Sequence, residues 1–203
     1  MLDVDGGGDT CADLRGPERL YLDLYENRDW IYRLLNVVRQ GNAEIVKRIY
    51  DEVAPYQGGC ISTGYKLWSP GRFYNMRNDF AYLIKPDLFR EIFLNPMIKE
   101  SETIDYTMFH AHTEDYKTNR EGRLAWLDVV LSIPRVQGVE WHAWEDFKKI
   151  IDAGKFVVTW LGVKQISDFV KAMGPKYLKR IWIISSAESR EEAETVIKML
   201  SRK

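Results

Sequence analysis

The run Lys155-Phe-Val-Val-Thr-Trp-Leu161 decides the fold class, because it is short and apolar and predicts a buried strand. A helical pattern over 144–153 precedes it and ends at Gly154, where glycine is the usual residue after a helix. A second helical pattern, over 163–173, follows it and ends at Gly174. A strand between two helices of this length indicates a parallel βαβ unit.

The same alternation extends over most of the chain. The residues expected to form strands are 58–64, 73–78, 104–112, 137–141, 155–161 and 180–185. This rhythm is that of a TIM-type (β/α)8 barrel, but a complete barrel takes about 250 residues, whereas the chain has 203. The first 55 or so residues fit loops and helices, so we expect an incomplete α/β barrel that lacks its opening strands. Residues 1–15 are expected to be a flexible leader, and 16–203 a single α/β domain.

The composition is that of an ordinary globular protein, with 45% hydrophobic and 29% charged residues. The net charge of −1 gives no basic excess for binding nucleic acid or an anionic membrane. No apolar run approaches the ~18 residues of a membrane span, and no secretory signal pattern precedes residue 15. Two cysteines make no disulfide framework. We therefore expect a cytoplasmic protein without nucleic-acid or membrane partners.

His110-Ala-His112 is the strongest local signal for chemistry. Residues two apart on a strand project from the same face, and sites in parallel βα folds form where the strands end. Two adjacent imidazoles suit a Zn²⁺ ion, an anion, or proton transfer near neutral pH. The alternative is a pair of polar residues that hydrogen-bond to their neighbours.

Other candidate residues follow other predicted strands. Glu140 and His142 form a second pair two residues apart, and Asp79 could act as a base or bind a substrate donor. We expect these groups to converge with the histidines, although Glu140 could pair with a surface cation, and His142 and Asp79 could serve as caps. Trp160 is expected to contact substrate.

The loop and run that follow position 67 add two weaker candidates, and Cys60 before them is a third. Arg72 could clamp a substrate carboxylate, or it could be a solvated loop arginine. Tyr82 is expected to bind substrate. Cys60 is expected to be buried and inert, although it could reach a metal held by the histidines.

A family resemblance appears in several of these segments. Leu20-Tyr-Leu-Asp-Leu-Tyr-Glu-Asn27 with its following helix, and Asn78-Asp-Phe-Ala-Tyr-Leu-Ile-Lys-Pro-Asp-Leu-Phe89, resemble the uroporphyrinogen decarboxylase-like superfamily. The rhythm of Leu131-Ser-Ile-Pro-Arg-Val-Gln-Gly-Val-Glu-Trp141 is also similar. That superfamily includes zinc-dependent, corrinoid-linked methyltransferases, and the resemblance runs from about Leu14 onward.

The resemblance implies one of two reactions on a small-molecule substrate. In the methyltransferase branch, a strand-end His-x-Cys pair and a distant cysteine hold zinc. Here His110 and His112 stand at the matching place, and no cysteine follows them. The resemblance to this branch implies a zinc ion held by His110 and His112 and a corrinoid protein as partner. In the decarboxylase branch catalysis is cofactor-free, and its substrate-binding arginines and aspartate lie mainly in early strands, so none is transferred here.

The expected function is therefore decarboxylation or methyl transfer at the carboxyl ends of the strands. The residues expected to carry it are Asp79, His110, His112 and Glu140. The alternative is a non-catalytic partial barrel that forms a homodimer or requires a partner chain, because an incomplete barrel exposes an unpaired edge at 58–64.

Overall fold

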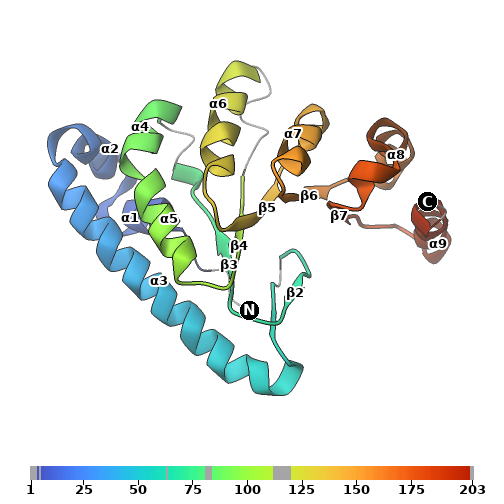
Figure 1. Ribbon diagram of the computed structural model, residues 1–203, viewed down its shortest axis with the longest axis horizontal. Helices are drawn as coiled ribbons and strands as arrows, with labels where there is room; N and C mark the ends of the chain where they lie inside the picture. Colours follow the sequence, from blue (N-terminus) through green and yellow to red (C-terminus); the bar gives the residue numbers. More distant parts are fainter. Residues whose placement is uncertain (1–3, 5, 63, 81–83, 112–119, 202–203) are drawn as a thin grey trace. The chain divides into compact units, whose positions relative to one another are not determined.

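The computed structural model describes residues 4, 6–62, 64–80, 84–111 and 120–201, and it shows a mixed α/β fold (Figure 1). The helices are α1 (Gly7–Arg15), α2 (Pro17–Glu26), α3 (Arg28–Gln57), α4 (Pro86–Ile92), α5 (Leu94–Glu102), α6 (Arg120–Leu131), α7 (Phe147–Asp152), α8 (Val163–Leu178) and α9 (Arg190–Ser201). The strands are β1 (Cys60–Ile61), β2 (Trp68–Ser69), β3 (Phe73–Met76), β4 (Tyr106–Phe109), β5 (Val136–Glu140), β6 (Phe156–Trp160) and β7 (Ile181–Ile184).

Five strands form a parallel sheet in the order β3-β4-β5-β6-β7, as the alternation of strands and helices predicts. The described residues do not show a (β/α)8 barrel, because they contain five strands of this kind. The chain divides into two compact units, residues 1–137 and 138–203, and each is treated by itself below.

In the first unit, β3 and β4 pair in parallel, with Asn75 opposite Met108 and Met76 opposite Phe109. The side chain of Tyr74 lies toward α3, where Asn42 contacts its hydroxyl group. Alternation along the strand therefore places Asn75 on the other face of the pair. The long helix α3 packs against α1, α2 and α5 (Figure 1).

The amino-terminal segment differs from the flexible leader that its glycines suggested. Residues 7–15 form α1, and the Cys11 side chain in it is fully buried. A Cβ atom at Gly8 would lie 2.0 Å from the side-chain oxygen of Asn78. The glycine at this position thus permits close packing of α1 against the chain that follows β3, rather than providing flexibility.

The prediction of a sheet strand over 58–64 is wrong. Among the described residues of this range, only Cys60 and Ile61 form a strand, and they pair antiparallel with β2 in a separate two-stranded sheet. Gly58 adopts the left-handed conformation (φ 66°) that ends α3, so it belongs to the helix terminus. The unpaired parallel edge expected at this place is therefore not present.

In the second unit, β5, β6 and β7 pair in parallel, with Val139 opposite Val157 and Val157 opposite Ile181. Gly138 allows a close approach, because a Cβ atom there would lie 2.2 Å from a ring carbon of Phe156. The helical conformation of α8 is interrupted at Gly174 (φ 71°), where the sequence predicted the helix to end. Among all described residues, no helix combines the length and apolar character needed to span a bilayer.

Candidate functional site

Each unit has one group of side chains at or near the carboxyl ends of its parallel strands. The first group consists of Tyr65, Asn75, Asp79 and His110, which lie in the first unit, and we call it the His110 group. The second consists of Glu140, His142 and Trp160, in the second unit, and we call it the Glu140 group. Each group is described on its own.

His110 is positioned by the pairing of β3 and β4. Its backbone N–H donates to the Met76 carbonyl at 2.9 Å, which continues the strand pairing to the carboxyl end of β3. Alternation along β4 places His110 on the same face as Met108, whose partner on β3 is Asn75. Strand register therefore brings Asn75 and His110 to one face of the sheet.

Both nitrogens of the His110 imidazole face a polar neighbour. The hydroxyl oxygen of Tyr65 lies 2.7 Å from Nδ1, and Oδ1 of Asp79 lies 3.8 Å from Nε2. The Asn75 amide donates to the Tyr65 hydroxyl oxygen at 3.4 Å. When Tyr65 donates its proton to Nδ1, the proton of a neutral imidazole is on Nε2, which faces the Asp79 carboxylate. The His110 side chain is 13% exposed, so the ring is mostly shielded but accessible.

The backbone around Asp79 is held by α1. The Asp9 carboxylate accepts the N–H groups of Asp79 (2.9 Å) and Phe80 (2.7 Å). The capping role considered for Asp79 is thus performed by Asp9. The Asp79 carboxylate itself lies 3.4 Å from the Arg77 guanidinium and 3.8 Å from His110.

The Glu140 group brings three predicted residues together. Glu140 is 4% exposed, and its Oε1 atom accepts the indole N–H of Trp160 at 3.1 Å. Nε2 of His142 lies 3.4 Å from the same oxygen. The Trp160 side chain is half exposed, so it presents an apolar surface beside a buried carboxylate. This arrangement suits binding and orientation of a substrate that carries an apolar portion.

Arg72 lies away from the His110 group. It precedes β3, and it forms two side-chain hydrogen bonds of 3.0 Å with Asp105, which precedes β4. Both residues are therefore at the amino-terminal ends of their strands, whereas His110 follows the carboxyl end. The hydrogen bonds from Arg72 lower the pKa of the Asp105 carboxyl group. The structure pairs Arg72 with Asp105, and the predicted substrate contact of Arg72 stays a prediction.

His112 and Tyr82 lie outside the described residues, so their predicted roles stay predictions. Cys60 is fully buried, and burial raises the pKa of its thiol, as expected for an inert cysteine. In the part of the chain that the structure describes, no three histidine, cysteine or carboxylate side chains gather as a metal site would require. The zinc prediction depends on His112 and stays untested.

Sequence reasoning missed Tyr65, Asn75 and Asp9. Asn75 carried a usable signal, because it is a polar residue inside the predicted strand 73–78. Tyr65 lies in the loop between β1 and β2, and Asp9 lies in the segment expected to be flexible. Only tertiary contacts reveal the roles of these two residues.

In comparisons with known proteins, no family model matches the chain, and neither a curated protein nor a solved structure matches it. The uroporphyrinogen decarboxylase-like resemblance therefore stays a prediction.

Proposed function

We propose that the protein is an enzyme of the uroporphyrinogen decarboxylase-like type that removes a carboxyl group from a small molecule, with His110 as the proton donor. One observation carries this proposal: the imidazole lies between the Tyr65 hydroxyl group at Nδ1 and the Asp79 carboxylate near Nε2. A histidine placed between a phenol and a carboxylate can exchange protons near neutral pH.

The chemistry of decarboxylation needs such a group. The bond between the substrate carbon and its carboxylate breaks, CO₂ leaves, and the electron pair stays on the carbon. A proton must then reach that carbon, and a general acid in place contributes about 10²- to 10⁴-fold to the rate. The Asp79 carboxylate lies 3.8 Å from Nε2, on the side of the ring opposite Tyr65, where it would orient the imidazole toward a substrate.

The Glu140 group of the second unit is a separate candidate for ligand binding. The half-exposed Trp160 indole offers a face for an apolar or aromatic portion of a ligand. Glu140 is oriented by Trp160 and His142, so it would accept a hydrogen bond from a ligand N–H or O–H group.

The test is an assay of CO₂ release from small aromatic and pyrrole carboxylic acids, coupled to bicarbonate detection. We expect His110→Gln to lose about 10²- to 10⁴-fold in kcat, while Arg33→Gln, an exposed position on α3, keeps the activity of the original chain. Full activity in the His110→Gln protein would refute the assigned role.

Methyl transfer is distinguished by elemental analysis of the purified protein. Near-stoichiometric zinc in the original protein, lost in the His110→Ala/His112→Ala double variant, would favour thiol methyl transfer over decarboxylation as the reaction. Sedimentation of an inactive, metal-free chain as a dimer would favour the non-catalytic, self-associating alternative.

A further inference from the structure

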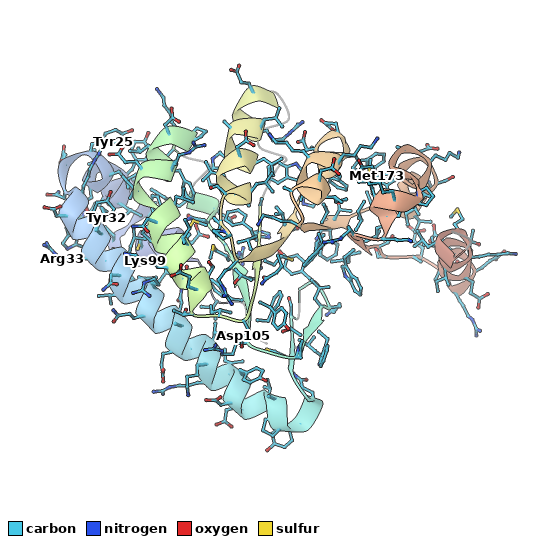
Figure 2. All side chains as sticks on the ribbon, in the orientation of Figure 1. Tyr25, Tyr32, Arg33, Lys99, Asp105 and Met173 are labelled. Atoms are coloured by element: carbon cyan, nitrogen blue, oxygen red, sulfur yellow. The ribbon has the colours of Figure 1, made fainter. Side chains whose placement is uncertain are left out.

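A polar pocket of about 340 Å³ lies on helices α3, α4 and α5 of the first unit. Its walls include Tyr32, Asn36 and Arg39 from α3, Glu91 from α4, and Asn95 and Lys99 from α5. Figure 2 labels Tyr32 and Lys99, whose side chains come from the two neighbouring helices. None of these residues belongs to the His110 group, so the pocket has no part in the proposed reaction.

The charges in the pocket sum to an excess of positive charge. The Glu91 carboxylate forms an ion pair with Arg28, a residue outside the pocket walls. The Arg39 guanidinium donates to the Asn36 side-chain oxygen at 2.8 Å, and this bond fixes its orientation without neutralising it. Within the described ranges, the structure gives the Lys99 ammonium group neither an ion pair nor a hydrogen bond. Arg39 and Lys99 therefore remain as two cations on facing walls.

We propose that this pocket binds a small multivalent oxyanion, namely inorganic phosphate or the phosphate group of a monoester. An arginine presents a planar set of donors that matches oxyanion geometry, and a lysine adds a compact charge. The Asn95 amide offers a further donor on the same walls, whereas the Tyr32 hydroxyl group donates to the Glu91 carbonyl oxygen at 3.4 Å. The volume is at the lower end of the roughly 300–1,000 Å³ typical of ligand pockets, which fits a small ligand.

Arg39 also links the pocket to the protein interior. Burial raises the pKa of Glu100, which is 2% exposed, and the positive charge of Arg39 opposes part of that rise. Glu100 lies among Asn42 of α3, Tyr74 of β3 and Cys11 of α1. An anion bound to Arg39 would offset that positive charge, so Glu100 would hold its proton to higher pH.

The experiment is calorimetric titration of the full chain with inorganic phosphate at pH 7, with ionic strength held constant by sodium chloride. We expect saturable binding that Lys99→Gln weakens by about tenfold or more, as loss of a charge-assisted contact would. Arg39→Gln should weaken it similarly. Arg33→Gln removes a cation from the same helix outside the pocket and should change the affinity less than twofold.

Two results would overturn the proposal: no saturable heat, or equal weakening by Arg33→Gln and Lys99→Gln, which would indicate general screening. A parallel titration with phenyl phosphate distinguishes the two sources of the anion. Tighter binding than inorganic phosphate assigns the pocket to a monoester whose organic part lies against Tyr32, and weaker binding assigns it to free phosphate.

Discussion

The buried carboxyl group of Glu100 should make the stability of the first unit depend on pH. Glu100 accepts a hydrogen bond from Asn42 at 3.0 Å, and Asn42 also lies 3.3 Å from the Tyr74 hydroxyl group. Burial raises the pKa of Glu100 from its usual 4.5 to about 7, and the hydrogen bonds from Asn42 and Tyr74 only partly oppose that effect. The folded state therefore holds a proton that the unfolded state has already released between these two pH values.

The sign and size follow from linkage. A carboxyl group with a raised pKa in the folded state stabilises it fully below pH 4.5, and the contribution is lost as pH rises through 7. A shift of this size corresponds to about 3 kcal/mol, most of it lost between pH 5 and pH 8. With a urea dependence of about 1–3 kcal/mol per molar, this group should lower the urea midpoint by roughly 1–2 M over that range.

The assay is urea unfolding followed by circular dichroism at pH 5, 6, 7 and 8. Glu100→Gln cannot ionise, so the difference in unfolding free energy between it and the original chain should change by about 2–3 kcal/mol from pH 5 to pH 8. Glu102→Gln removes an exposed carboxylate from the same helix and serves as the control. If Glu100→Gln shows the same pH dependence as the original chain, Glu100 does not carry the coupling and the reasoning is refuted.

Two further predictions test the packing of each unit. Gly138→Ala places a methyl group against the Phe156 ring and should lower the free energy of unfolding by about 1–3 kcal/mol, measured by thermal unfolding. As a control, the methyl group of Gly41→Ala in α3 meets nothing within 4 Å and should raise the free energy of unfolding by up to about 1 kcal/mol. Equal effects of the two substitutions would contradict the close approach at Gly138. The thiols of Cys11 and Cys60 are fully buried, and burial raises the pKa of Cys11 to about 12. A disulfide reagent should therefore modify both thiols slowly in the folded chain and rapidly in urea. Rapid modification without urea would show that one of the two thiols is accessible.

The parallel strands could be predicted because their signal is local. The run 155–161 is apolar and bounded by glycine-terminated helices, and the structure places β6 within it. The error at 58–64 has the same origin, because small residues around Cys60 fit a strand locally. Only the left-handed Gly58 and the antiparallel partner strand β2 show that this segment belongs to a hairpin.

The candidate sites were predictable where two residues share one strand end. Glu140 and His142 lie two positions apart, and the structure places Nε2 of His142 3.4 Å from Oε1 of Glu140. Arg72 directly precedes β3 and therefore lies at its amino-terminal end, and the strand predicted before it at 58–64 does not belong to the parallel sheet. Its Asp105 partner is 33 residues away and became visible only with the register of β3 and β4.

The contribution of α1 changes how the His110 group should be understood. Asp79 follows β3 and, with Phe80, forms the described part of a 3-10 turn. The two backbone hydrogen bonds to Asp9 hold that turn, and the close approach of Gly8 to Asn78 lets α1 reach it. A proton donor depends on geometry within about half an ångström, so the position of Asp79 beside His110 depends on residues that local sequence patterns assign to a leader. Removal of residues 1–15 should therefore affect the His110 group before it affects the Glu140 group, in which Glu140 contacts Trp160 and His142 within the second unit.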